Sequence, residues 1–256
     1  MSQLKAGIRK DGTELFKTYR IYIFALGFVL FAVLDPVMVY VMPKMMKAAG
    51  LDMSALLGGM DLQSMGLIAY AGDCLQMGML AMLLSMMKAA GGDQKDHSCV
   101  IPLCVGYRRS TYIYSKFCVY PLTAFGFGII GYWMAYGVSY LLYPVKFPLS
   151  QALLLSLALA VFMAFAASLM LLIGCSTGRA GVSAVILFFA FTIINTILPR
   201  LKWDQFHPFA LPGFLTGTLD RIENLPSFWV SVGTAALLCP VLALIAAQLF
   251  QRKKLV

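Results

Sequence analysis

Asp35 and Asp73 are the residues in this sequence whose type and position suggest chemistry most directly. Each lies in a long apolar run, where a membrane-buried carboxylate costs on the order of 2.5–3.5 kcal/mol. At about 1.5 Å per residue, Asp35 lies roughly 20 Å above the inner face of a roughly 30 Å hydrocarbon core, and Asp73 lies roughly 10 Å below its outer face. Because these depths coincide, we expect the two acids to line a pathway and to bind or pass cationic cargo. Alternatively, each bonds a neighbouring Ser, Tyr or backbone group, or reaches the outer interface.

The other reactive side chains form no recognisable catalytic set. The sequence contains no GxxxxGK[ST] phosphate loop and no HExxH zinc motif. His97, Cys99 and Cys104 have the spacing of an incomplete metal site, but a pair of reduced thiols is the favoured interpretation. The sixteen methionines suggest copper handling, although methionine more often fills gaps in helix packing. We therefore predict that the chain is not an enzyme and binds no metal or cofactor itself.

The composition predicts that these residues are carried by membrane-spanning helices. Hydrophobic residues make up 61% of the 256 residues, and charged residues 12%, whereas soluble domains have about 45–50% and about 25%. Such a chain lacks the polar side chains to cover a soluble surface. Only helices satisfy every backbone group in lipid within one continuous segment, so an all-α membrane protein is expected.

The whole chain, 1–256, is predicted to be one transmembrane domain with six spans. Each apolar run is long enough to cross about 30 Å of hydrocarbon, the fifth being the shortest. The predicted spans are 21–41, 66–87, 117–143, 152–173, 182–198 and 228–250. Residues 1–20 carry apolar side chains at helical spacing among basic ones, which favours an amphipathic helix on the inner leaflet over a solvated basic tail.

The distribution of basic residues predicts the orientation. With both termini inside, fourteen of the twenty Lys and Arg residues lie on the cytoplasmic side and six lie outside, as the positive-inside rule requires. We therefore expect a multi-pass protein of the cell membrane with both termini in the cytoplasm. The net charge of +9 is explained by contact with the lipid bilayer, and no nucleic-acid partner is needed.

Two connections between the predicted spans are too long to be simple turns. The external segment 199–227 contains four prolines and several Phe and Leu residues among its charged ones, so it either dips back toward the bilayer or forms a surface cap. On the cytoplasmic side, segment 96–111 combines an apolar stretch at Pro102, Leu103 and Val105 with the basic pair Arg108 and Arg109. Such a segment is suited to docking in a groove of a soluble partner, or alternatively to anchoring on anionic lipid.

The layout resembles the stand-alone permeases of the ABC type-2 exporter superfamily. The likeness covers the whole chain by topology and about fifty residues by motif. The motifs are Pro102…Arg108-Arg109-Ser110…Ser115-Lys116-Phe117 before span three, the opening Lys10-Asp11…Glu14-Leu15-Phe16-Lys17-Thr18-Tyr19-Arg20, and the ending Phe250-Gln251-Arg252-Lys253-Lys254. One departure, Asp35-Pro36 within the first span, leaves the substrate open.

The resemblance implies a membrane subunit of an ATP-driven exporter for peptides, drugs, lipids or ions. A separate ABC ATPase, in two copies, would supply ATP and magnesium, and a second permease subunit, identical or homologous, would complete the pathway. A coupling helix within 96–111 would contact the ATPase, through Pro102, Leu103, Val105, Arg108, Arg109 and Ser110. The alternative is an ion-coupled secondary transporter that uses Asp35 and Asp73, although the inverted repeat often found in such transporters is not evident.

Overall fold

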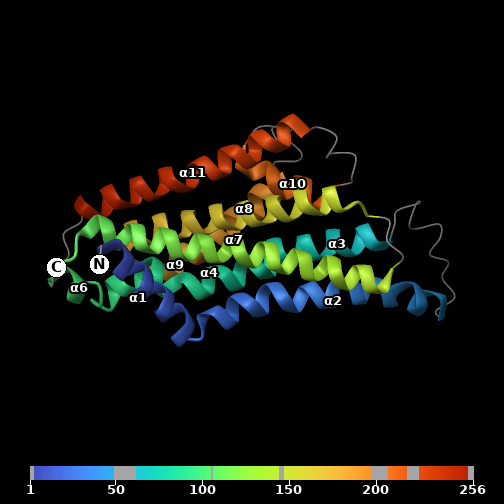
Figure 1. Ribbon diagram of the computed structural model, residues 1–256, viewed down its shortest axis with the longest axis horizontal. Coiled ribbons are helices and arrows are strands. Elements are labelled where there is room, and N and C mark those ends of the chain that lie inside the picture. Colours follow the sequence, from blue (N-terminus) through green and yellow to red (C-terminus); the bar gives the residue numbers. More distant parts are fainter. Residues whose placement is uncertain are drawn as a thin grey trace.

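The structure, a computed structural model, is an elongated bundle of helices (Figure 1). It describes residues 3–48, 62–104, 106–143, 147–197, 207–217 and 225–252, and no β-strand occurs among them. Five helical stretches are long and apolar enough to cross a membrane: Arg20–Ala48, Leu62–Lys95, Arg109–Leu142, Leu149–Thr177 and Pro226–Arg252. The predicted all-α class is confirmed, and the composition and these five helices together identify a membrane protein.

Eleven α-helices are described among these residues, numbered in chain order. Their bounds are α1 Gln3–Lys17, α2 Arg20–Ala48, α3 Leu62–Asp73, α4 Met79–Met87, α5 Asp93–Lys95, α6 Val100–Cys104, α7 Arg109–Leu142, α8 Leu149–Thr177, α9 Ala180–Ile197, α10 Leu211–Thr216 and α11 Leu225–Arg252. Two π-helical segments, Cys74–Gly78 and Lys88–Gly92, join α3, α4 and α5 into one helical run, and a 3₁₀ turn, Pro208–Ala210, precedes α10.

The helix boundaries differ from the predicted spans in informative ways. α2 continues to Ala48 and α7 begins at Arg109, so both are longer than the apolar runs at 21–41 and 117–143. Helices extend beyond their apolar segments because their hydrogen-bonded backbone needs no hydrophobic side chains. The fifth predicted span, 182–198, falls on α9, whose apolar part is the shorter helix Gly181–Ile194. A sixth membrane crossing therefore stays a prediction.

α8 is the central helix of the bundle. Of its most apolar window, 72% is buried inside the protein, against 33–50% for the other four long helices. It packs against α7, α11, α9 and α10. Two glycines allow close approach: a Cβ on Gly128 of α7 would lie 2.8 Å from the Cα of Ala160, and one on Gly174 would lie 2.5 Å from the Cβ of Ala90. Small residues at such contacts are how helices pack closely where water exclusion contributes little.

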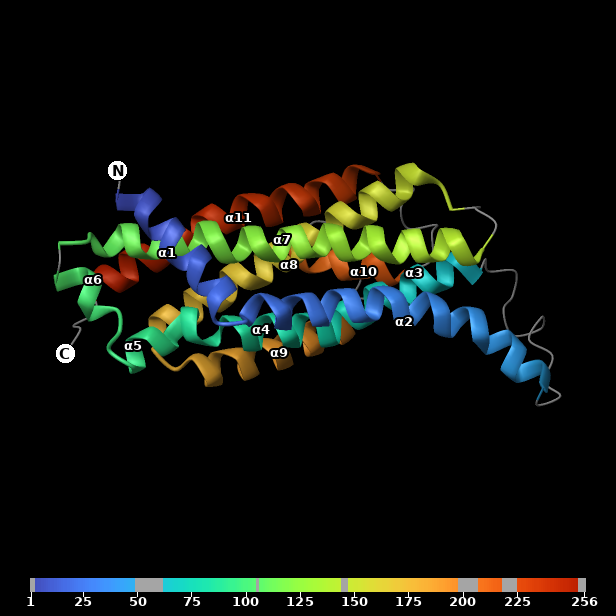
Figure 2. The ribbon, with the colours of Figure 1, turned by 60° about the horizontal axis from the view of Figure 1, so that its bottom comes forward.

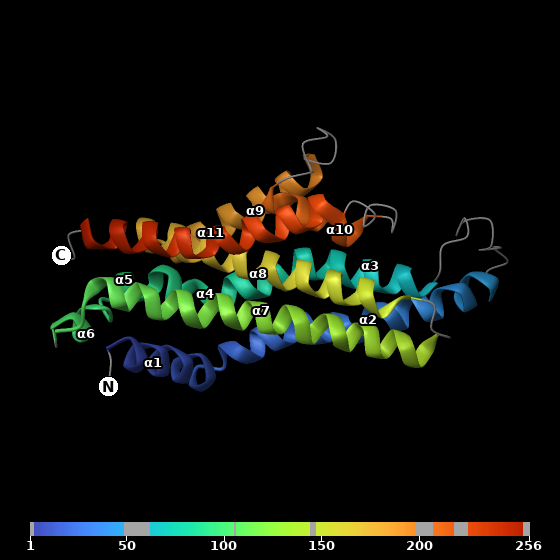
Figure 3. The same cartoon turned by 45° about the horizontal axis from the view of Figure 1, so that its top comes forward.

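One end of the bundle collects the start and the end of the described chain. α1, α6 and the last turns of α11 lie together there (Figures 1, 2 and 3), and we call this the basal end and the opposite one the distal end. The Tyr112 ring of α7 stacks on the Phe250 ring of α11, with centroids 5.8 Å apart. The described chain therefore begins and ends at the same end of the bundle, and the cytoplasmic location of that end stays a prediction.

The N-terminal helix packs on the bundle by only part of the apolar stripe predicted from the sequence, which consists of Leu4, Ile8, Leu15 and Tyr19. Its buried residues are Gly7, Asp11 and Leu15, which lie on one face and contact α7. Leu4 and Ile8, which belong to the predicted apolar stripe, are each 38% exposed. A helix is present within residues 1–20, as predicted. Contact of its exposed apolar residues with the inner leaflet stays a prediction.

The segment before α11 folds back into the bundle from the distal end. The Phe209 ring lies 5.7 Å from the rings of both Phe165 in α8 and Phe191 in α9. Phe165 is about 24 Å along α8 from its first residue, so Phe209 reaches roughly the middle of that helix. Within the described residues 207–217 the segment therefore turns inward toward α8, and its return toward the bilayer stays a prediction.

Candidate functional site

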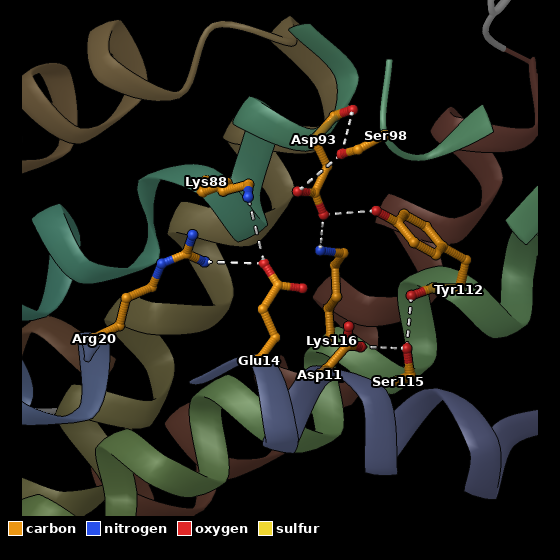
Figure 4. Close-up of polar contacts among 9 residues, drawn as sticks. All are labelled: Asp11, Glu14, Arg20, Lys88, Asp93, Ser98, Tyr112, Ser115 and Lys116. Atoms are coloured by element: carbon orange, nitrogen blue, oxygen red, sulfur yellow. Dashed lines mark hydrogen bonds and ion pairs between the residues drawn. The ribbon is translucent and has the colours of Figure 1, made fainter. Parts of the chain in front are cut away.

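A buried ion pair forms the centre of a polar network at the basal end (Figure 4). Lys116 Nζ lies 2.6 Å from Asp93 Oδ2, and their side chains are 2% and 7% exposed. The Tyr112 hydroxyl donates to the same oxygen at 2.8 Å, and the Ser98 hydroxyl lies 3.4 Å from Asp93 Oδ1. Because buried charges are tolerated when they are paired and hydrogen-bonded, this arrangement holds the segment after α4 against α7.

The N-terminal helix is bound to the same network by a second buried acid. The Ser115 hydroxyl donates to Asp11 Oδ2 at 2.6 Å, and Asp11 is 2% exposed. Burial raises the pKa of the Asp11 carboxyl above its usual value, although the nearby Lys116 charge and the Ser115 hydrogen bond act in the opposite direction. Lys10 lies over the Tyr112 ring, 5.6 Å from its centroid, which adds a cation–π contact between α1 and α7.

A more exposed set of charges joins α1 to the first two spans. Glu14 Oε1 lies 3.5 Å from Arg20 Nη1 and 3.8 Å from Lys88 Nζ. Arg20 opens α2, and Lys88 opens the π-helical segment after α4, so one carboxylate of α1 contacts two helices. These contacts are long and partly solvated, and we assign them a smaller contribution than that of the buried Lys116–Asp93 pair.

Segment 96–111 is divided between a short helix and the start of α7. Pro102 and Leu103 lie on α6, whereas Arg109 and Ser110 form the first turn of α7; Val105 lies outside the described residues. The apolar stretch predicted in this segment is only partly exposed, because Leu103 packs against the cluster that includes Cys99, Tyr112 and Phe250.

Beyond α6 the segment turns back toward α1. Gly106 has φ +89°, and its carbonyl accepts a hydrogen bond from Gln3 Nε2 at 3.3 Å. The Tyr107 hydroxyl donates to the Gln3 carbonyl at 2.7 Å. Arg108 is exposed directly before α7, and Arg109 Nη1 donates to the Gln251 carbonyl at 3.3 Å.

A cavity of about 400 Å³ lies between α1 and this turn. Its lining residues are Gln3, Ala6, Gly7, Lys10, Asp11, Pro102, Gly106, Tyr107, Tyr112 and Ser115. The cavity thus borders the buried network on one side and the α6 segment on the other. A partner that contacts α6 would therefore act close to the groups that attach α1 to α7.

The two intramembrane acids lie on helices that pack against each other. Asp35 belongs to α2, and Asp73 is the last residue of α3. Asp35 is only 8% exposed, and its Oδ2 atom is buried without a hydrogen-bond donor. That the two carboxyls meet at one depth and pass cargo stays a prediction.

The backbone near the acid pair departs from regular α-helix on both sides. Pro36 follows Asp35 within α2, so one backbone N–H donor is missing there. The π-helical segment Cys74–Gly78 begins immediately after Asp73, and such segments occur frequently at functional sites. Composition and hydropathy gave no signal for this segment, because the change from α to π spacing depends on how α3 and α4 pack against α2.

The remaining reactive side chains are not brought together. Among the described residues, no group of three or more His, Cys, Asp or Glu side chains could hold a metal ion. Cys99 is buried, whereas Cys104 is exposed on α6. Met79, Met82 and Met86 are buried in the hydrophobic core, where they fill space between helices.

A G-x-S-x-G sequence pattern, Gly174-Cys-Ser-Thr-Gly178, lies at the end of α8. Nucleophilic serines of this pattern sit on a strand-to-helix turn. Here Ser176 lies in the last turn of a helix, and its hydroxyl donates to the Ile173 carbonyl at 2.8 Å. Gly178 adopts φ +70° as the left-handed residue that ends α8. The pattern is thus accounted for as a helix terminus.

Comparison of the chain with models of protein families, with curated proteins and with solved structures gives no match. The function must therefore be argued from the arrangement of the helices and of these two polar sites.

Proposed function

We propose that this protein is the membrane-spanning permease subunit of an ABC-type exporter. The observation that carries the proposal is the attachment of segment 96–111 to the bundle: the residues that flank α6 are joined to α7 by the buried Lys116–Asp93 pair and to α1 by Tyr107. A force applied to α6 by a partner would reach α7 and the helical run Leu62–Lys95 through short polar contacts. A loop serving only as a connection needs no such attachment.

The proposed topology has six crossings with both termini in the cytoplasm. α8 and α11 both run from the distal to the basal end, so α9 returns toward the distal end between them (Figure 3). With 18 residues, α9 is within the range of about 17–25 that crosses a bilayer. The excess of basic residues on one side supports a cytoplasmic basal end and a location in the cell membrane.

The energy source and the rest of the pathway come from partners in this proposal. The chain has no phosphate-binding loop, so a separate ABC ATPase, in two copies, would bind ATP and magnesium. A second permease subunit, identical or homologous, would complete the pathway for a peptide or another amphipathic or cationic substrate. The ATPase would contact the basal end at Pro102, Leu103, Val105, Arg108, Arg109 and Ser110.

Copurification in mild detergent tests the partnership. The tagged protein is expected to retain an ATPase whose hydrolysis is stimulated by the reconstituted permease. Arg108→Glu reverses an exposed charge beside α6 and should weaken this association, whereas Arg179→Glu makes the same change at an exposed position in the α8–α9 connection. Equal retention of the ATPase by both variants and the wild type would contradict the assigned contact, and absence of any ATPase would contradict the proposal.

A second candidate function is supported by Asp35, a buried acid of α2 whose Oδ2 atom has no hydrogen-bond donor, and by Asp73 on the neighbouring helix α3. Paired acids inside a membrane are typical of proton or cation pathways, which favours an ion-coupled secondary transporter. The two candidates differ in their energy source. Uptake or efflux in proteoliposomes that depends on an ion gradient without any ATPase would select the second, and dependence on ATP and a copurified ATPase would select the first.

A further inference from the structure

The cavity at the basal end has the size of a small-molecule site. Its volume of about 400 Å³ lies within the range of about 300–1,000 Å³ that is typical of such sites in proteins. One wall is a face of α1, and the other is formed by the connection from α6 into the first turns of α7. α1 and α7 pack against each other at this end (Figures 2 and 3). A ligand in the cavity would therefore contact both elements at once.

Most of the accessible surface of the cavity is apolar. Ala6 and Gly106 are exposed, and Pro102 and Tyr107 are half-buried, so these four lining residues supply much of that surface. The Tyr107 hydroxyl donates to the Gln3 carbonyl at 2.7 Å, so this polar atom already has a partner without a ligand. Such walls favour a ligand with an apolar body, because transfer of apolar surface from water is favourable.

The two charged residues of the lining differ in how far they reach the cavity. Asp11 is 2% exposed, and its Oδ2 accepts a hydrogen bond from the Ser115 hydroxyl, so its carboxyl contributes almost no surface. Lys10 is exposed, and among the described residues no carboxylate lies within ion-pair distance of its Nζ. Its Nζ instead lies over the Tyr112 ring, 5.6 Å from the centroid. The charge that a ligand meets in the cavity is therefore positive.

The surroundings of the cavity have the same sign of charge. Arg108 is exposed, and its backbone N–H donates to the side-chain oxygen of the lining residue Gln3 at 3.4 Å. Arg9, on α1, is also exposed. The nearest further acid on α1, Glu14, is engaged by two basic side chains of other elements. Because charges of one sign around a cleft raise the local concentration of the opposite charge, this site favours anions.

We propose that the cavity binds a compact amphipathic anion, a molecule with an apolar body and one carboxylate, sulfonate or phosphate group. The anionic group would pair with the Lys10 ammonium, and the apolar body would lie against Ala6, Pro102 and Tyr107. The bound molecule would fill the space between α1 and the α6–α7 connection and so hold α1 against α7. Binding of this anion is independent of the ATPase partnership, so its failure would leave the proposed function untouched.

A membrane lipid fits the cavity less well than a soluble molecule does. All lining residues precede the predicted spans 21–41 and 117–143, so the cavity borders the membrane interface and not the hydrocarbon. A lipid presents its polar headgroup at that depth, whereas the walls of the cavity are mostly apolar. The proposed ligand is therefore a soluble anion.

Photolabelling with para-benzoylbenzoate tests the site. This probe joins one carboxylate to a benzophenone, which forms bonds to nearby C–H groups on illumination. With the purified full-length protein in phosphatidylcholine nanodiscs, we expect saturable labelling that mass spectrometry maps to α1 and to the α6–α7 connection. para-Benzoylbenzylamine has the same body but a cationic group, and it should label these peptides much more weakly, because its ammonium would lie beside Lys10. Equal labelling of these peptides by both probes, or no labelling of them by the anion, would overturn the proposal.

Substitutions on α1 separate the charge from the apolar wall. Lys10→Gln removes the charge and should raise the half-saturating probe concentration by about tenfold, whereas Lys10→Arg keeps the charge and should retain labelling. Ala6→Phe fills the apolar part of the cavity and should abolish labelling. Lys5→Gln is the matched control, because Lys5 is exposed on the same helix but is not among the lining residues, and it should change nothing. Labelling unaltered by both Lys10→Gln and Ala6→Phe would contradict the assigned site.

A lipid headgroup is tested as the other occupant by adding phosphatidylglycerol to the nanodiscs. A soluble ligand site should keep its saturable labelling by the anionic probe, and the dependence on Lys10 should persist. Loss of labelling at these peptides, with the amine probe unaffected, would assign the cavity to anionic lipid and overturn the proposal. Lys10 and Ala6 are both exposed, so their variants are expected to fold, and gel filtration checks this.

Discussion

Replacing Lys116 by methionine is the sharpest test of the basal polar network. Methionine keeps most of the length and apolar volume of the lysine side chain but removes its charge. Asp93 would then remain buried, at 7% side-chain exposure, with hydrogen bonds from neutral hydroxyls but no cation beside it. Removing one partner of a buried ion pair is costly because the charge of the other partner stays in the interior.

The expected magnitude follows from the geometry of the pair. At 2.6 Å and an effective dielectric constant of about 20, the attraction between the two charges is about 6 kcal/mol. The desolvation of each ion costs several kcal/mol and offsets much of this, so the intact pair contributes little net stability. Lys116→Met alone should nevertheless lower the free energy of unfolding by about 3–5 kcal/mol. Adding Asp93→Asn should recover part of that loss, since the double variant has no unpaired charge.

A double-mutant cycle measured by unfolding in mixed micelles provides the assay. The fluorescence of the three tryptophans reports the transition for the wild type, for Lys116→Met, for Asp93→Asn and for the double variant. We expect the double variant to be more stable than the sum of the two single losses predicts, by more than 1 kcal/mol, as is usual for coupled residues. Strictly additive losses would refute the reasoning, because they would mean that the two groups do not interact.

Three further predictions concern other contacts. Because burial raises the pKa of Asp11, the folded protein holds this proton more tightly, and the contribution of Asp11 to stability should fall as the pH rises from 3.8 through the folded-state pKa; Asp11→Asn should remove this difference in unfolding measured against pH. Gly174→Leu should lower stability by at least about 1–3 kcal/mol in thermal unfolding, because a Cβ alone would lie 2.5 Å from that of Ala90. In a variant whose sole cysteine is Cys104, an impermeant thiol reagent should label inverted vesicles but not intact cells; labelling of intact cells would reverse the proposed orientation.

The sequence by itself determined that the apolar segments of this protein lie in lipid and that they are helices. Long apolar runs with few charges have only one stable solution in lipid, a helix, because every backbone group must be satisfied within the segment. The helical class of these segments could therefore be predicted from the sequence. The rarity of acids within them was also evident from the sequence. The depth of Asp35 and Asp73 could be calculated in advance because the rise of a helix is constant.

Only the tertiary structure decided which polar side chains have partners. Nothing in the spacing of Asp11, Asp93 and Lys116 shows that they converge, because the residues come from three separate elements and their contact depends on how α1 and α7 pack. The face of α1 that docks was hidden for the same reason: its buried acid is satisfied by Ser115, a residue about one hundred positions away. Coincident depth predicts one level for Asp35 and Asp73, but the rotation of each helix about its own axis decides which way its carboxyl points. A sequence carries that rotation only through the packing of all its side chains together.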